Sequence, residues 1–116
     1  MTMTMSETES ILARLMGVIE ARRDNPSERS YTNKLLTGGV DAIGAKITEE
    51  AAEVIEAAAE AGEEGREHLV REAADLIYHL FVMLGFREIK LAEVEAELAR
   101  RFGISGIDEK EARKKD

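Results

Sequence analysis

Acidic side chains recur at three-residue intervals in two separate segments of this sequence. The first reads Glu49-Glu50-x-x-Glu53, and the second, after eighteen intervening residues (54–71), reads Glu72-x-x-Asp75. Residues three apart share one face of a helix, so two helices would each present a pair of carboxylates on one side. Such pairs on facing helices would repel each other and resist ionisation unless a divalent cation lay between them. A metal site is therefore one interpretation of this spacing, and a solvated helix face is the other.

The surroundings of the second pair favour the metal site. Its neighbours are Val70, Ala73, Ala74, Leu76 and Ile77, in the most apolar stretch of the chain. Mg²⁺ fits best, because this hard cation takes carboxylate oxygens in octahedral geometry and keeps positions open for water and phosphate. No cysteine is available for a softer metal. Such a site could bridge phosphate oxygens and activate a water for cutting a phosphoanhydride, although spacing and context alone leave the solvated face open.

Other polar side chains near these acids have alternative roles. Lys46 lies one turn before the first acidic pair, where it can form an ion pair along the helix or contact a phosphate. His79 continues the helical face of His68 and the second acidic pair, and we expect it to be a hydrogen-bonded neighbour of the site rather than a ligand. Tyr31 and Tyr78 are expected to pack with a polar tip.

The apolar pattern places the acids on helices. Apolar residues recur at three- and four-residue intervals, proline occurs once, and β-branched runs are few. We predict five helices. The first is capped by Ser6 and Glu9 and ended by Asp24-Asn25-Pro26, and a short second one over 31–36 is capped by Ser30 and ended by Gly38-Gly39. The other three extend over about 41–62, 64–84 and 91–102, and Gly103 follows the last. The tail, about 104–116, is predicted to be polar and partly mobile. The fold class is therefore all-α, a helical bundle that dimerisation completes.

Each of the later helices has a predicted buried face. These faces comprise Ile43, Ile47, Ala51, Val54, Ile55 and Ala58 in the third helix, Leu69, Ala73, Leu76, Ile77, Leu80 and Leu84 in the fourth, and Val94, Leu98 and Phe102 in the fifth. Gly85 is expected to weaken the end of the fourth helix.

Length and charge limit the possible functions. At 116 residues the chain is predicted to form one domain, 1–116. The net charge of −8, with basic residues clustered only at 112–115, argues against nucleic acid as a partner. No apolar run approaches the roughly 20 residues of a membrane span, and residues 1–6 lack the features of a secretory signal. We therefore expect a cytoplasmic protein with no membrane partner.

The motifs resemble a known family. The acidic pattern is similar to that of the MazG-like all-α NTP pyrophosphohydrolases, and further segments resemble one branch, phosphoribosyl-ATP pyrophosphohydrolase. These segments are Arg22-Arg23-x-x-Pro26, Ser30-Tyr31-Thr32-x-x-Leu35, Gly39-Val40-Asp41-x-x-x-x-Lys46-Ile47-x-Glu49-Glu50, Ala73-Ala74-Asp75-Leu76-x-Tyr78-His79-Leu80 and Ser105-Gly106-Ile107-x-Glu109-Lys110-x-x-Arg113. The resemblance runs from about residue 11 to 113. Gly44 and Thr48 depart from the usual pattern without changing a proposed ligand.

The resemblance implies an activity and a set of site residues. The activity would be Mg²⁺-dependent hydrolysis of phosphoribosyl-ATP to phosphoribosyl-AMP and pyrophosphate, the second step of histidine biosynthesis, by a homodimer. The implied metal ligands are Glu50, Glu53, Glu72 and Asp75, with Glu49 close to the attacking water or to an outer-shell partner. The implied contacts to the phosphates or to the ribose phosphate are Lys34, Lys46 and Arg71. The cyclohydrolase for the next step, fused in some members, would be a separate protein here.

Two other functions remain as alternatives. A house-cleaning nucleoside triphosphate pyrophosphohydrolase would use the same metal site on ordinary NTPs or dNTPs. The Ser30-Tyr31-Thr32 segment and the Ser105-Gly106 tail argue against it. A non-catalytic helical interaction protein would carry its acids as a solvated surface, and the apolar neighbours of Glu72 and Asp75 argue against that.

Overall fold

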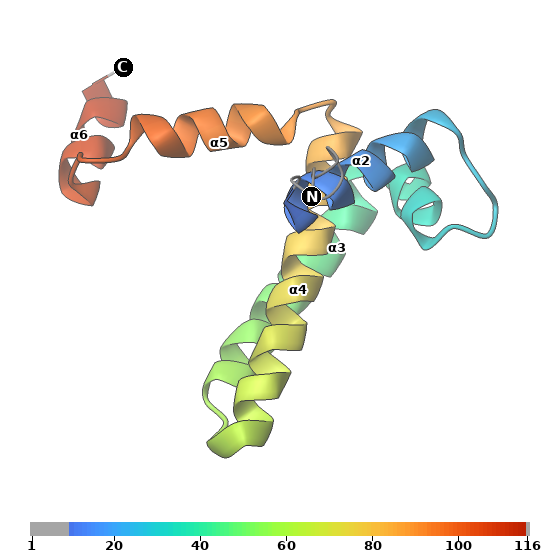
Figure 1. The fold of residues 1–116 in the computed structure, drawn as a ribbon, viewed down its shortest axis with the longest axis horizontal. Coiled ribbons are helices and arrows are strands. Elements are labelled where there is room, and N and C mark those ends of the chain that lie inside the picture. The colour runs from blue at the N-terminus through green and yellow to red at the C-terminus, as the bar shows by residue number, and fades with distance from the viewer. Residues whose placement is uncertain (1–9, 116) are drawn as a thin grey trace, which may run out of the picture.

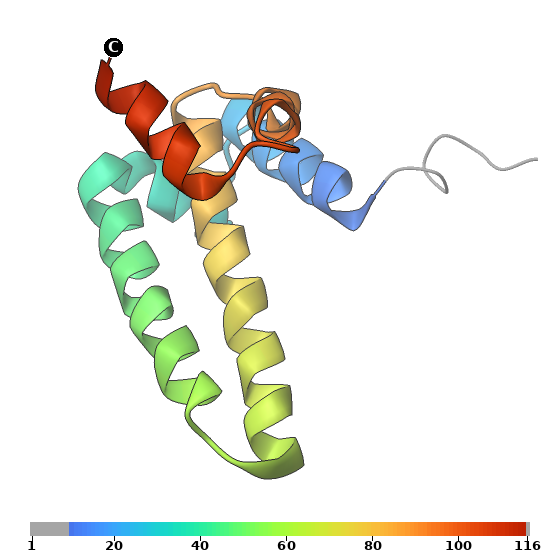
Figure 2. The ribbon, with the colours of Figure 1, turned by 90° about the vertical axis from the view of Figure 1, so that its left-hand side faces the viewer.

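The fold is built from helices that meet at one end of a long hairpin. The computed structural model describes residues 10–115, which form α2 (Ile11–Asp24), α3 (Tyr31–Ala58), α4 (Gly62–Phe86), α5 (Leu91–Arg100) and α6 (Gly106–Lys115). α3 and α4 run side by side as an antiparallel hairpin, and α2 packs across the end where α4 finishes (Figure 1, Figure 2). α5 and α6 project from that end, and we call them the C-terminal arm. No strand occurs within residues 10–115, which confirms the all-α prediction.

Serine side chains cap the first two of these helices. The Ser10 Oγ accepts a hydrogen bond from the Ala13 amide at 3.0 Å, and the Ser30 Oγ accepts one from the Asn33 amide at 3.2 Å. Each bond satisfies an amide that has no partner inside its helix. The predicted cap at Ser30 is therefore confirmed, whereas the predicted cap formed by Ser6 and Glu9 lies outside the described residues.

Gly39 breaks the regular course of α3. The helix extends without a gap from Tyr31 to Ala58, but Gly39 has φ 70° and ψ −159°, a conformation that favours glycine. The two helices predicted before and after Gly38-Gly39 are thus joined across a kink. The kink separates the part of α3 that carries Leu35 from the part that runs along α4.

The core lies where α2, α3 and α4 meet. Its buried members are Met16, Ile19, Leu35, Ile43, Phe81 and Val82. Gly85 is buried there as well, and a Cβ on it would lie 2.9 Å from the Ile19 Cγ2. α2 and α4 therefore approach each other closely at this glycine. Gly85 is also the penultimate residue of α4, which ends at Phe86, close to the predicted end of this helix.

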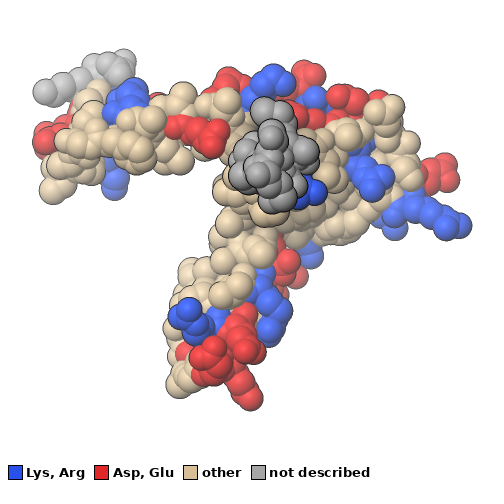
Figure 3. Space-filling model, in the orientation of Figure 1, with Lys and Arg blue, Asp and Glu red and all other residues tan. Residues whose placement is uncertain are grey.

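Several residues predicted to be buried are exposed. They are Ile55, Ile77, Leu80, Leu98 and Phe102, together with Ala58. Beyond the core, α4 packs on α3 alone, so the side of α4 turned away from α3 has no neighbour within residues 10–115. Figure 3 shows that much of the visible surface of the hairpin and the arm is uncharged, with acidic and basic side chains gathered at the far end of the hairpin.

The C-terminal tail contains a helix that was not predicted. α6 begins at Gly106, and its Glu109 is 5% exposed although most of the helix is polar. The Arg100 Nη2 on α5 lies 2.7 Å from the Glu109 Oε1, and the Arg113 Nε lies 3.3 Å from the same oxygen. Charge pairs rather than an apolar stripe tie α6 to α5, which is why hydrophobic periodicity did not indicate it. α5 itself ends at Arg100, and Gly103, with φ 83°, follows it.

No helix among the described residues combines the length and the apolar character needed to cross a bilayer.

Candidate functional site

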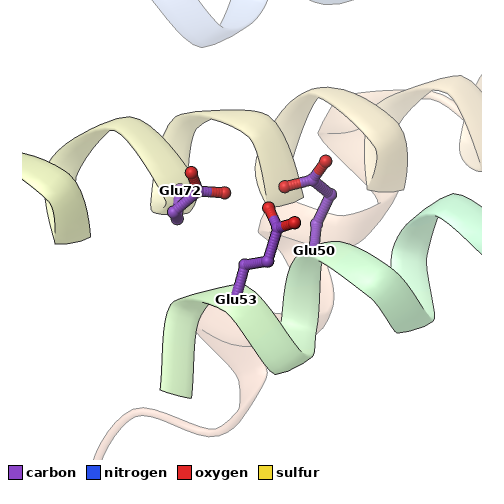
Figure 4. Close-up of side chains that lie close together, drawn as sticks. All are labelled: Glu50, Glu53 and Glu72. Carbon is purple, nitrogen blue, oxygen red and sulfur yellow. The ribbon is translucent and has the colours of Figure 1, made fainter. Parts of the chain in front are cut away.

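Three of the four predicted metal ligands meet between the helices of the hairpin. Glu50 and Glu53 extend from α3 and Glu72 extends from α4, so that their carboxylates point toward one another (Figure 4). One oxygen from each of the three lies within 4.8 Å of the others. We call these three residues the carboxylate cluster. Its spacing is suited to oxygen ligands around a single cation.

Helical periodicity explains why Glu50 is buried. The side of α3 that faces α4 carries Ile43, Ile47, Glu50 and Ala57 at three-, four- and seven-residue intervals, and Ile43 and Ala57 are fully covered. Glu50 therefore occupies a position that an apolar residue would take in an ordinary helix pair. The apolar stripe predicted through Ala51 and Ile55 does not lie on the side of α3 that faces α4. The prediction placed the buried face elsewhere because the residue at position 50 is charged.

The cluster contains buried oxygen atoms without a partner. Glu50 is 6% exposed, and its Oε2, like the Oε2 of Glu72, is buried and accepts no hydrogen bond. Burial raises the pKa of the Glu50 carboxyl to about 7, with the adjacent Glu72 carboxyl and the negative charge of Glu53 acting in the same direction. A buried carboxylate without a partner is destabilising. The donor set, oxygen only and negatively charged, is the one that Mg²⁺ prefers.

Asp75 and Glu49 lie outside the cluster. Asp75 is exposed, yet it is close enough for its negative charge to contribute to the raised pKa of Glu50. Glu49 is also exposed, and its Oε2 lies 3.2 Å from the Lys46 Nζ. Of the two roles considered for Lys46, the ion pair along the helix is the one present in this structure.

Lys34 and Arg71 line separate pockets. Lys34 lies with Pro26 and Asn33 where α3 begins, and Arg71 lies with Glu60 and His68 at the far end of the hairpin. Neither side chain joins the carboxylate cluster. Their contacts with phosphate stay a prediction.

His79 links the two helices beside the cluster. Its Nδ1 lies 2.7 Å from the Asp75 carbonyl oxygen, and its Nε2 lies 2.9 Å from the Tyr31 hydroxyl oxygen. A carbonyl only accepts, so Nδ1 carries the proton and, in the neutral ring, Nε2 accepts from Tyr31. Burial raises the pKa of the Tyr31 hydroxyl, which keeps it protonated as that donor. Tyr31 also stacks on Tyr78, with ring centroids 6.2 Å apart.

A second histidine contact was missed from the sequence. The His68 Nδ1 lies 2.9 Å from the Glu60 Oε2, and its Nε2 lies 3.3 Å from the Glu72 Oε1. The four-residue spacing of His68 and Glu72 in the sequence indicates the contact between these two residues, but not the contact of His68 with Glu60. Glu60 follows the end of α3, and only the return of the chain into α4 brings it to His68.

Comparison with known proteins identifies the family. Residues 12–102 match the family described as Phosphoribosyl-ATP pyrophosphohydrolase. The chain belongs to this family. The matched residues include the carboxylate cluster, every other residue proposed for the site, and both partners of His68.

Curated relatives of the family match over nearly their whole length. The chain is 54% identical to the phosphoribosyl-ATP pyrophosphatase of Rhodopirellula baltica, over 97% of this chain and 95% of the relative. It is 50% identical to the protein of the same name from Dinoroseobacter shibae, over 90% and 99% of the two chains, and 47% identical to that of Geotalea daltonii, over 90% and 96%. The resemblance noted from the motifs is confirmed. The chain is therefore an enzyme, a hydrolase, and not a non-catalytic helical protein.

Proposed function

We propose that this enzyme hydrolyses phosphoribosyl-ATP between its α and β phosphates, with Mg²⁺, to give phosphoribosyl-AMP and pyrophosphate. This is the second step of histidine biosynthesis. The relatives are named for acting on this substrate. The structural observation that supports a metal-dependent reaction is the pair of buried oxygens, one on Glu50 and one on Glu72, that have no partner in the protein.

The carboxylate cluster fits a divalent cation. Glu50, Glu53 and Glu72 would hold it, and Asp75, whose negative charge also acts on Glu50, would be the fourth ligand. When bound, Mg²⁺ supplies positive charge against the phosphate oxygens and lowers the pKa of water. The protein contributes the fixed positions of the carboxylates, because both helices of the hairpin present them from regular backbone.

The remaining residues have roles in substrate orientation. Glu49 lies next to Glu50 and is exposed, so it can accept a proton from the attacking water once the Lys46 ammonium turns to a phosphate. Lys34 and Arg71 would contact the more distant phosphates. His79 holds Tyr31 at the edge of the site through the hydrogen bond between them.

The enzyme is proposed to work as a homodimer. The support is the exposed apolar side of α4, which carries Val70, Ile77 and Leu80 at helical spacing and turns away from the cluster. Burying this side against a second copy would remove apolar surface from water. Light scattering should give twice the chain mass, and Ile77→Glu should give a monomer; a monomeric wild-type chain would refute the dimer.

The experiment is a pyrophosphate-release assay on phosphoribosyl-ATP and a panel of NTPs and dNTPs, with and without Mg²⁺. Wild type and Glu72→Gln would be compared, since this change removes a charge with almost no change in shape. Release should require Mg²⁺, favour phosphoribosyl-ATP and be lost in the variant. Faster release from ordinary nucleotides would instead indicate the house-cleaning activity, and release that persists without metal would contradict the metal site.

A further inference from the structure

His68 lies between two carboxylates and continues the cluster toward the far end of the hairpin. Its Nδ1 contacts Glu60, which follows α3, and its Nε2 contacts Glu72 on α4. The exposed fraction of the side chain falls along this series, from 47% for Glu60 to 31% for His68 and 13% for Glu72. The contacts therefore lead from the surface to Glu72, a partly buried member of the cluster.

The two oxygens of Glu72 have different surroundings. Oε1 lies 3.3 Å from the His68 ring, whereas Oε2 is buried and has no hydrogen-bond partner. The ion-pair contact to one oxygen favours one rotation of the Glu72 carboxylate about its last bond, which otherwise turns over a broad range. His68 thus holds Glu72 in the orientation that leaves Oε2 available to the cluster.

Glu60 fixes the ring in turn. Both of its oxygens lie close to the His68 Nδ1, at 3.0 and 2.9 Å, so the ring is held from the side opposite Glu72. Without Glu60, a histidine that is about one third exposed on a helix surface would sample other rotamers. The arrangement also connects the turn after α3 to α4.

We propose that His68, anchored by Glu60, is a positioning residue that orients Glu72 for binding a divalent cation. This inference rests on the metal site of the proposed function. It concerns a histidine that neither binds the metal nor touches substrate. Partners that orient a metal ligand typically change metal affinity by about 10- to 100-fold, and the partial exposure of His68 places the expected effect near the lower end.

The test uses amide side chains that replace one ring nitrogen each. The amide nitrogen of glutamine reaches the place of Nε2, beside Glu72, and that of asparagine reaches the place of Nδ1, beside Glu60. His68→Gln, His68→Asn and His68→Leu would be compared with wild type by Mn²⁺ binding, measured from the electron paramagnetic resonance signal of free Mn²⁺. Mn²⁺ is a suitable probe because it shares the preference of Mg²⁺ for carboxylate oxygens.

We expect the Mn²⁺ dissociation constant to rise about tenfold in His68→Leu and in His68→Asn. His68→Gln should recover most of this loss, since it restores the contact to Glu72. In pyrophosphate release, the Mg²⁺ concentration for half-maximal rate should rise in His68→Leu, while kcat at saturating Mg²⁺ returns close to that of wild type. Loss of a residue that only stabilises the fold would not raise the Mg²⁺ requirement while leaving kcat at saturating Mg²⁺ close to that of wild type.

Glu60→Gln has a matched control in Glu64→Gln. Both glutamates line the same pocket, but of these two only Glu60 forms an ion pair with His68. Glu60→Gln should weaken Mn²⁺ binding and Glu64→Gln should not. Equal affinities for wild type and His68→Leu, tighter binding by His68→Leu, or equal losses in the two glutamate variants would each overturn the positioning role. If wild type itself does not bind Mn²⁺, the metal site fails and this inference fails with it.

Discussion

Glu50 in the hairpin and Glu109 in the C-terminal arm are almost equally buried, with 6% and 5% of their surfaces exposed. Their surroundings are opposite. Glu109 receives a charged hydrogen bond from Arg100 at 2.7 Å and lies near Arg113, and the Arg100 guanidinium holds its pKa below the usual range. Glu50 forms no ion pair among residues 10–115, and burial, together with the carboxyl groups of Glu72 and Glu53, raises its pKa to about 7.

The comparison shows that burial alone does not distinguish a structural carboxylate from a functional one. In the arm, the protein itself supplies the cation, and the carboxylate joins two helices. In the hairpin, neither Glu50 nor Glu53 forms an ion pair with a basic side chain of residues 10–115, and Lys46, which lies nearby, pairs with Glu49. The missing positive charge is what indicates a site for an external cation.

The largest expected effect separates the two buried glutamates by activity. Glu50→Gln removes a cluster charge, and pyrophosphate release should fall about a hundredfold or more, since even the outer partners of metal ligands cost 10- to 100-fold. Glu109→Gln makes the same chemical change in the arm and should leave kcat/KM close to that of wild type. Steady-state assays at saturating Mg²⁺ measure both. Equal losses in the two variants would contradict the distinction drawn between the two regions.

The second expected effect distinguishes Glu50 from Glu109 by the way in which the stability of the fold depends on pH. The folded-state pKa of Glu50, about 7, lies above its ordinary value of 4.5. Its contribution to stability is therefore fully present below about pH 4.5 and is lost as the pH rises through 7. In EDTA, the melting temperature should fall between pH 5 and 8, by about 4 °C or more for each kcal/mol lost in a chain of this size. Mg²⁺ at pH 8 should restore it.

Glu50→Gln is the control for this titration. The glutamine amide does not ionise. The melting temperature of the variant should therefore lack the part of the fall between pH 5 and 8 that ionisation of Glu50 causes in wild type. In EDTA at pH 8 it should melt above wild type, and Mg²⁺ should raise its melting temperature less. Parallel pH profiles for wild type and Glu50→Gln would mean that the Glu50 carboxyl is not a destabilising charge.

The sequence predicted the helices of the hairpin more fully than it predicted their faces. Ser30 as a cap and a break at Gly38-Gly39 follow from local backbone chemistry, and the structure has both. Ile77 and Leu80 were assigned to a buried side, but periodicity does not reveal that a single chain offers no neighbour to that side of α4. A hydrophobic pattern identifies a face that must be covered without identifying what covers it.

The site was predictable to the extent that its parts share one helix. The pairing of Glu50 with Glu53 follows from three-residue spacing, and the hairpin brings Glu72 to them. Helical spacing also places Asp75 on the same face as Glu72, yet Asp75 is exposed and lies outside the cluster. The contact of His68 with Glu60 depends on the path of the turn between α3 and α4, which no local pattern specifies.

The smallest expected effect concerns the ion pairs of the arm. Arg100 contacts both Glu97 and Glu109, and Arg100 with Arg101 lowers the pKa of Glu97 to about 2. A depressed carboxyl pKa stabilises the fold above the ordinary value of 4.5, and this contribution is lost as the pH falls toward 2. Because the side chains of Arg100, Arg101 and Glu97 are about 40–50% exposed, salt screens the pairs that Glu97 forms with the two arginines, and each pair contributes little.

Arg100→Gln should therefore loosen α6 without affecting catalysis. Amide hydrogen exchange in 106–115 should be faster in the variant at pH 7 and low salt, while kcat/KM stays that of wild type. The difference should shrink in 1 M salt, where the Debye length is about 3 Å. Lys110→Gln is the matched control, since it removes the same charge from an exposed position of α6 that forms no ion pair among the described residues. If amide exchange in α6 is equally fast in both variants, net charge rather than the Arg100–Glu109 pair holds α6. The contrast between Glu109, with its basic partner, and Glu50, without one, would then have no consequence for stability.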